Sequence, residues 1–306
     1  MSLTCTVELN AAVNCSDAKF TGSLKFLQPN SAALYYRYLI AMKRKSPAPE
    51  KSLFFAAKIE ELDKIKVGAV SYLNTKPLLY GIKRDPELLE QLELWEEFPA
   101  KIAAMLLDGS IDVGLVPVRI IPMLKESYII SDYCIGSDGE VASVGLFSEV
   151  ALHEIETVLL DYQSRTSVEL CKVLCKHHWK IDPAFEDGGI NFIQHIRGKT
   201  AGVVIGDRAL KLRESMPYEF DLAAAWKEMT GLPFVFAAWV ANKKLPEDFI
   251  SHFNKANAEG IVQLDAVIAE NSYSHYDLQV YYRRNISYLL DENKRDGLKK
   301  FLELVE

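Results

Sequence analysis

The chain has 306 residues, of which 49% are hydrophobic and 25% charged, which is enough apolar material for two packed lobes. Its formal net charge of −7, with both signs interspersed, provides no basic stripe for a phosphate backbone and argues against nucleic-acid binding. No segment approaches the roughly 20 apolar residues that span a bilayer, and the N-terminus lacks a signal-peptide pattern. We therefore expect no membrane association and a cytoplasmic location.

Residues 1–63 differ in character from the rest of the chain. A basic cluster at 43–45 and a proline-containing segment at 46–49 interrupt any sustained periodicity. We treat this region as an N-terminal extension. It could be a small added structure, a partner-binding arm, or sequence upstream of the usual start.

From residue 64 onward, short apolar runs alternate with helical patterns. The runs predict strands over 65–70, 111–116, 143–147, 157–160, 201–205 and 234–240. The helical patterns begin near Pro77 and cover 99–107, 167–177, about 247–271 and about 291–305. This alternation predicts an α/β fold.

The order of these elements favours two lobes joined by two crossovers, near Leu146 and near Ala238. The first lobe is then discontinuous, over 64–146 and 239–306, and the second covers 147–238. Ligands of such a fold are expected in the central cleft, where strand ends and helix N-termini face each other.

The turn over 71–77 follows a buried strand and precedes a helix. The Ser71 and Thr75 hydroxyls, the Asn74 amide and free backbone N–H groups can converge there on an anionic ligand. The alternative is simple capping of the helix by Asn74 or Thr75.

A second turn, over 161–167, also lies between a strand and a helix. It concentrates the hydroxyls of Ser164, Thr166 and Ser167 and the guanidinium of Arg165 at a helix N-terminus, which suits a carboxylate. The alternative is that Ser164 caps the helix and Arg165 lies on the surface.

Two further polar positions flank the predicted crossover and the strand over 201–205. Ser143 can present its hydroxyl to the cleft, whereas Asp138 is interpreted as a turn former. Asp207 follows a strand and a glycine, which suits either a ligand-facing acceptor or a helix cap.

Metal and common cofactor signatures are missing from the sequence. Cys171 and Cys175 lie one turn apart in an apolar helix and are interpreted as reduced core thiols, and His177 and His178 as solvated residues. The glycine-rich, Walker, nucleophile-elbow and His-Glu-x-x-His motifs do not occur. We expect neither a metal nor a cofactor.

Taken together in order and spacing, several segments resemble the MqnA family of chorismate dehydratases over residues 64–306. The segments that carry this resemblance are 67–78, 164–167, 205–207, 230–237 and 284–288. The resemblance implies a type II periplasmic-binding-protein fold used as an enzyme. Its activity would remove water from chorismate to give 3-[(1-carboxyvinyl)oxy]benzoate, in the futalosine route to menaquinone.

The resemblance also implies roles for the residues of the turns. Asn74 would be catalytic, and since a neutral amide is no base, the enolpyruvyl carboxylate of the substrate would take the proton while the amide orients it. The expected substrate-binding residues are Ser71, Ser143, Ser164, Arg165, Thr166 and Asp207. Two alternatives stay open: a non-catalytic small-anion solute-binding protein, and the related dihydroxynaphthoate synthase of the same pathway.

Overall fold

The structure is a computed structural model that describes residues 5–6, 25–26 and 64–305. Within the predicted N-terminal extension, β1 (Cys5–Thr6) pairs antiparallel with β2 (Lys25–Phe26), and the rest of 1–63 lies outside the described residues. The chain divides into two units between Glu60 and Glu61. All that follows concerns the second unit.

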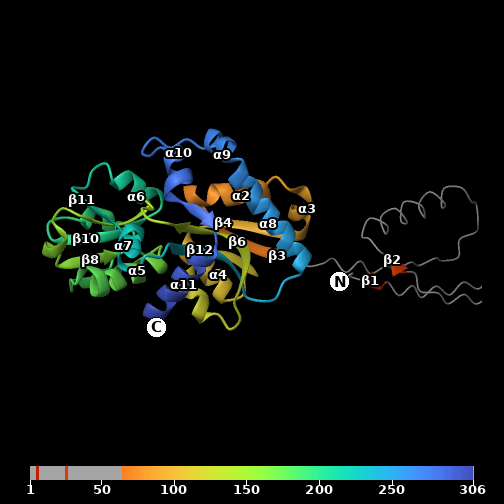
Figure 1. Cartoon of the computed structure of the whole chain (residues 1–306), viewed down its shortest axis with the longest axis horizontal. Coiled ribbons are helices and arrows are strands. Elements are labelled where there is room, and N and C mark those ends of the chain that lie inside the picture. Colours follow the sequence, from red (N-terminus) through yellow and green to blue (C-terminus); the bar gives the residue numbers. More distant parts are fainter. Residues whose placement is uncertain (1–4, 7–24, 27–63, 306) are drawn as a thin grey trace, which may run out of the picture. The chain divides into compact units, whose positions relative to one another are not determined.

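Strands and helices alternate through this second unit (Figure 1). The strands are β3 (Ile65–Val70), β4 (Leu92–Glu97), β5 (Val113–Pro117), β6 (Tyr128–Ser137), β7 (Val144–Ser148), β8 (Thr157–Leu160), β9 (Ala184–Asp187), β10 (Thr200–Ile205), β11 (Tyr218–Asp221), β12 (Phe234–Ala241) and β13 (Ser287–Leu289). The α-helices are α2 (Lys76–Ile82), α3 (Pro86–Gln91), α4 (Pro99–Leu107), α5 (Thr166–Leu174), α6 (Asp207–Leu212), α7 (Leu222–Thr230), α8 (Glu247–Val262), α9 (Leu264–Glu270), α10 (Leu278–Val280) and α11 (Glu292–Val305). Short 3-10 or π segments are η1 (Leu73–Thr75), η2 (Val118–Met123), η3 (Leu152–Glu154), η4 (Cys175–Trp179), η5 (Phe192–His195) and η6 (Tyr281–Asn285).

The strands form two separate sheets, which confirms the predicted α/β fold. Six strands pair in the order β13-β6-β12-β5-β3-β4, and we call this sheet with its helices the first lobe. Five strands pair in the order β11-β7-β10-β8-β9, and they form the second lobe. In both sheets parallel strands lie at one side and antiparallel strands at the other.

The chain passes between the two sheets at positions that differ from the predicted ones. Leu146 pairs with Val203 inside the second sheet, and Ala238 pairs with Val116 inside the first. The passages therefore lie between β6 and β7 and between β11 and β12, and both predicted boundaries fall inside strands. An apolar run signals a strand, but it carries no information about which sheet that strand joins.

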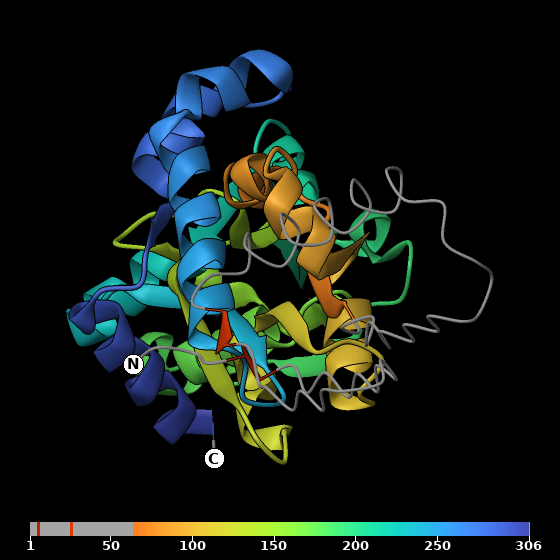
Figure 2. The same cartoon turned by 90° about the vertical axis from the view of Figure 1, so that its right-hand side faces the viewer.

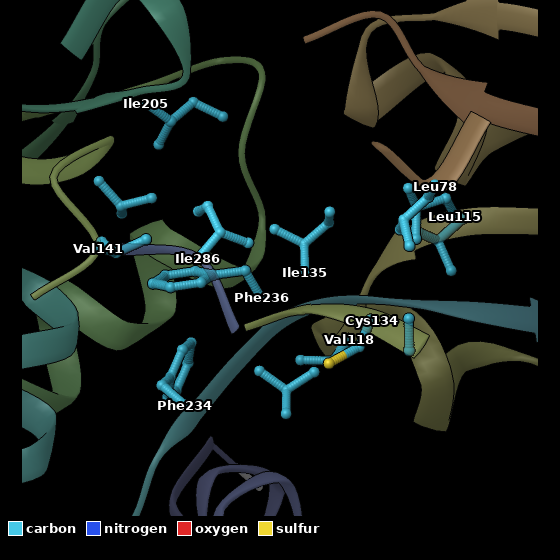
Figure 3. Packing of buried hydrophobic residues seen from close by; sticks show 14 of the residues in the cluster. Leu78, Leu115, Val118, Cys134, Ile135, Val141, Ile205, Phe234, Phe236 and Ile286 are labelled. Atoms are coloured by element: carbon cyan, nitrogen blue, oxygen red, sulfur yellow. The ribbon is translucent and has the colours of Figure 1, made fainter. Parts of the chain in front are cut away.

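One hydrophobic cluster runs through both lobes. Figure 3 shows Ile135 and Phe236 of the first sheet, Ile205 of the second, and Val141 of the segment between β6 and β7 as part of it. In the first lobe α2 packs closely along α8, as the orange and blue helices of Figure 2 show. A Cβ atom at Gly260 would overlap the Pro77 carbonyl oxygen, so this close approach requires glycine.

Among the described residues, no helix is both long enough and apolar enough to cross a membrane.

Candidate active site

A cavity of about 60 Å³ lies between residues of the two lobes. Its polar wall consists of Tyr72, Asn74, Thr75, Ser143, Ser164, Thr166 and Ser167. Its remaining wall consists of Val70, Pro99, Pro117, Ile135, Val141, Val144, Ile205, Gly206, Phe236 and Ala237. The predicted residues Asn74, Ser143, Ser164 and Thr166 thus meet at one cavity, although three separate chain segments supply them.

Asn74 sits in η1, between the end of β3 and the start of α2. Hydroxyl groups from the C-terminal segment fix the backbone of this turn: Tyr282 donates to the Leu73 carbonyl and Tyr288 to the Asn74 carbonyl, each at 3.0 Å. The Asn74 Oδ1 atom accepts from Thr75 Oγ1 at 3.3 Å. The amide therefore stands on a backbone that is held by side chains outside the cavity wall.

The turn over 161–167 is organised around the buried carboxylate of Asp161. Its oxygens accept from the Gln163 N–H at 3.0 Å and from Arg208 Nη2 at 2.7 and 2.9 Å. Burial raises the pKa of Asp161, and the Arg208 charge opposes that rise. Asp161 and Arg208 neutralise each other in this ion pair. The polar side chains of the cavity wall are all neutral.

Ser164 and Thr166 both line the cavity while making structural hydrogen bonds. Ser164 Oγ accepts from the Ser167 N–H at 3.1 Å, which caps the start of α5, as one of the two interpretations predicts. Thr166 Oγ1 accepts from the Arg119 N–H of the first lobe at 3.2 Å. Each hydroxyl keeps its own proton available to a ligand oxygen.

Ser143 reaches the cavity from the segment that joins the two sheets. The preceding residue, Ala142, has φ +62°, in the left-handed region that non-glycine residues rarely occupy. The Asp221 carboxylate holds this conformation by accepting from the Val141 and Ala142 N–H groups at 3.0 and 2.7 Å. Ser143 is fully buried, and its carbonyl accepts from the Gly206 N–H at 2.8 Å.

The lobes touch beside this cavity through the Asn74 turn. The Asp207 carboxylate accepts from the Leu73 N–H at 3.2 Å, and burial raises the pKa of that carboxyl group. The Tyr72 hydroxyl donates to Gln163 Oε1, which Arg208 Nη2 also contacts at 2.9 Å. Asp207 thus holds the turn at its backbone instead of facing the cavity.

Three of the predicted substrate-binding residues are not on the cavity wall. Ser71 is exposed and its N–H donates to the Glu97 carbonyl at 3.1 Å. Arg165 is exposed, with Nη1 3.9 Å from Met123 Sδ of the first lobe. Asp207 is the third, because its carboxylate accepts from the Leu73 N–H and does not face the cavity. Strand–turn–helix spacing therefore predicts which turns lie near the cavity better than it predicts which residues line it.

Several functional groups were not predicted from the sequence. Tyr72 lies within the predicted turn, so its neighbourhood was found although its role was not. Gln163 and Arg208 are 45 residues apart in the sequence and come into contact only in the folded chain. The spacing of the tyrosines in the C-terminal segment does not indicate that Tyr281 and Tyr282 pack against the Asn74 turn. No group of three potential metal ligands occurs within the part of the chain that the structure describes.

A family model described as menaquinone biosynthesis matches residues 65–306. The chain belongs to this menaquinone biosynthesis family. The match confirms the predicted family and includes every residue of the cavity wall.

Two relatives of this menaquinone biosynthesis protein are named chorismate dehydratase. The one from Thermus thermophilus is 30% identical over 262 residues, which is 78% of this chain and 93% of that protein. The one from Campylobacter jejuni is 27% identical over 250 residues, which is 77% of this chain and 95% of that protein.

Solved structures support the predicted architecture for this family member. Protein AF1704 from Archaeoglobus fulgidus has a TM-score of 0.60 at 15% identity, covering 79% of this chain and 96% of that one. A Candida albicans gene product, described as having the generic periplasmic binding protein fold, has a TM-score of 0.58 at 12% identity, covering 80% of this chain and 90% of that one. The predicted periplasmic-binding-protein-like fold is therefore confirmed.

Proposed function

We propose that the chain is a chorismate dehydratase, a hydro-lyase that converts chorismate to 3-[(1-carboxyvinyl)oxy]benzoate and water in menaquinone biosynthesis. Family membership and the names of the two relatives support this activity. The observation that carries the proposal is the meeting of the Asn74 amide with the hydroxyls of Ser143, Ser164 and Thr166 at one cavity. These neutral donors suit a substrate that carries two carboxylates.

The reaction requires loss of one proton and one hydroxide from the ring. The enolpyruvyl carboxylate of the substrate removes the C3 proton, and the electron pair that remains delocalises through the adjacent double bond toward the ring carboxylate. Departure of hydroxide from C4 then completes the aromatic ring, and the two fragments form water. In this scheme Asn74 orients the internal base and hydroxyl donors stabilise the charge that develops.

The cleft must open for this substrate to enter. Small-molecule sites typically enclose roughly 300 Å³ or more, whereas the cavity here has about 60 Å³. Hydrogen bonds between Leu73 and Asp207 and between Arg119 and Thr166 join the lobes near it. Closure over the substrate would exclude water and strengthen each hydrogen bond to the carboxylates.

Arg165 is proposed as a carboxylate contact at the mouth of the cleft, where its guanidinium is exposed near Met123 of the other lobe. An Arg165→Ala variant should therefore raise KM with less effect on kcat. The matched control is Arg197→Ala, an exposed arginine away from the cavity wall. Equal saturation curves for both variants and the wild type would remove Arg165 from the site.

Ser71 and Asp207 remain proposals as substrate-side groups of the same turn region. In the present conformation Asp207 accepts from Leu73, so a role in binding would follow from rearrangement as the lobes open. We also propose a cytoplasmic location. The free, buried thiols of Cys134, Cys171 and Cys175 suit a reducing compartment.

The first test mixes the purified protein with chorismate and follows products by absorbance and mass, with an enzyme-free control. Loss of one water to the carboxyvinyloxy-benzoate is the expected result. Saturable binding without turnover would instead favour a solute-binding protein. Turnover of a later pathway intermediate, but not of chorismate, would favour the related dihydroxynaphthoate synthase.

The second test replaces Asn74 with Asp. This change keeps the shape of the side chain but replaces the amide with a carboxylate, which should repel the substrate's carboxylate and lower kcat by roughly 100-fold or more. Asn191→Asp introduces the same charge at an exposed position off the cavity wall and serves as the control. Full turnover by the Asn74→Asp variant would contradict the assigned role.

A further inference from the structure

Two hydroxyl groups beside the cavity are buried and unused. Ser143 and Tyr281 both have side chains with 0% exposure. Within residues 64–305, neither Ser143 Oγ nor Tyr281 Oη makes a hydrogen bond of normal length and angle, although the Ser143 and Asn74 side chains lie within interaction range of the Tyr281 hydroxyl. A buried polar group without a partner destabilises the fold, so a well-packed protein seldom retains two of them in one place without a use.

The two hydroxyls lie close to the catalytic amide. Ser143 and Asn74 line the same cavity, and both side chains lie near enough to the Tyr281 hydroxyl to act on its ionisation. Burial raises the pKa of Tyr281 well above its ordinary value, against the lowering effect of those two neighbours. The phenol therefore keeps its proton throughout the neutral range and is a permanent donor.

Tyr281 is held rigidly in this place. Its N–H donates to the Asp277 carbonyl at 2.9 Å, and its carbonyl accepts from the Ile286 N–H at 3.0 Å. Its ring centroid lies 5.5 Å from that of Tyr282, whose hydroxyl supports the Leu73 carbonyl. The same short segment thus presents one tyrosine to the backbone of the Asn74 turn and the other to its side chain.

We propose that Tyr281 is a positioning residue of the active site, which holds the Asn74 amide and the Ser143 hydroxyl in register for an anionic oxygen of the substrate. This inference rests on the proposed dehydratase function. It goes beyond that function because it assigns a role to a group outside the cavity wall.

The donors and acceptors of such an arrangement balance. In the liganded site the Ser143 O–H donates to the substrate oxygen, and Ser143 Oγ accepts from the Tyr281 O–H. The Tyr281 oxygen in turn accepts from the Asn74 N–H, since Asn74 Oδ1 already accepts from Thr75. The Ser143 proton is then free for the substrate oxygen, because the Tyr281 O–H supplies the bond that Ser143 Oγ accepts.

The decisive variant is Tyr281→Phe, which removes the hydroxyl and leaves the ring. Because that hydroxyl makes no hydrogen bond of normal geometry, the urea midpoint should stay the same or rise. The kcat for chorismate should fall roughly 10- to 100-fold with little change in KM, as expected for a misplaced catalytic group. Combining it with Ser143→Ala should add little further loss of kcat, because both act through one arrangement.

Two control variants separate positioning from structural support. Tyr282→Phe removes a hydroxyl that has a partner at 3.0 Å, so its midpoint should fall. Tyr128→Phe removes an exposed hydroxyl that contacts Glu126 and should change neither midpoint nor kcat. A Tyr281→Phe midpoint that falls as in Tyr282→Phe, or an unchanged kcat, would overturn the inference.

The two readouts also separate this inference from the proposed function. If the wild type does not act on chorismate, the proposed function fails. The Tyr281→Phe midpoint can still be measured in that case: a maintained or raised midpoint supports a hydroxyl reserved for a ligand, and a lowered midpoint refutes it.

Discussion

Substitution of Gly206 by alanine tests whether closure of the lobes depends on a single close contact. Gly206 has φ +66° and ψ −149°, a conformation almost confined to glycine. An added Cβ atom would lie 2.9 Å from two atoms of the Tyr72 ring, which belongs to the other lobe. Backbone strain of this kind costs about 1–3 kcal/mol, and the contact with Tyr72 can be relieved only by moving that ring or separating the lobes.

The expected result for Gly206→Ala is therefore a lower urea midpoint together with a higher KM for chorismate, because the closed conformation becomes harder to reach. Gly231→Ala is the matched control. Gly231 has φ +75°, but a Cβ atom there would meet nothing within 4 Å. If the two variants lose equal stability and the KM of Gly206→Ala is that of the wild type, the contact with Tyr72 does not govern closure.

Three further predictions concern stability and are checked by urea unfolding. Asp161→Asn should cost about 3 kcal/mol, because it leaves the partly buried Arg208 charge without its carboxylate, and an Asp161→Asn, Arg208→Gln double variant should lose less than the sum. Gly260→Ala should cost about 1–3 kcal/mol by pushing α8 off the Pro77 carbonyl, and wild-type stability would refute the close packing. Burial raises the pKa of Glu219 from 4.5 to about 7, so the folded state binds this proton more tightly than the unfolded state does. The stability that the bound proton contributes is therefore lost as the pH rises from 4.5 to about 7, by at most about 3 kcal/mol. Glu219→Gln should remove that part of the pH dependence, and identical wild-type and variant curves would contradict it.

The elements that could be predicted are those whose signal is local. The strand over 65–70 and the helix over 99–107 occupy the predicted residues, because a buried strand or an amphipathic helix repeats its pattern within a few residues. The helix predicted over about 247–271 consists of two, α8 and α9, separated at Gln263. Its apolar period continues through the break, so periodicity alone did not reveal it.

Two of the missed strands have mixed patterns. β4 reads Leu-Glu-Leu-Trp-Glu-Glu and β11 reads Tyr-Glu-Phe-Asp, so neither forms a continuous apolar run. These strands lie at or near sheet edges, where one face meets solvent and a continuous apolar run is not required.

The part of the site that lies in turns between a strand and a helix could be predicted from the sequence. Strand–turn–helix spacing and the family resemblance led to Asn74, Ser164 and Thr166, which do meet at one cavity. The contacts that join the lobes could not be predicted, because residues such as Leu73 and Asp207 are 134 positions apart and neither sequence neighbourhood specifies the other.

The Asn74 amide, which we propose to be catalytic, belongs to one lobe, and the Ser164 and Thr166 hydroxyls, which we propose to bind carboxylates, belong to the other. Tyr282 and Tyr288 fix the Asn74 turn from within its own lobe, and these hydrogen bonds are independent of the cleft. Ser164 and Thr166 belong to the second lobe, and Asp207 of that lobe engages the turn at Leu73, the residue before Asn74. Because the Asp207–Leu73 contact joins the lobes next to Asn74, we expect closure of the lobes to assemble the proposed site and to exclude water in the same movement.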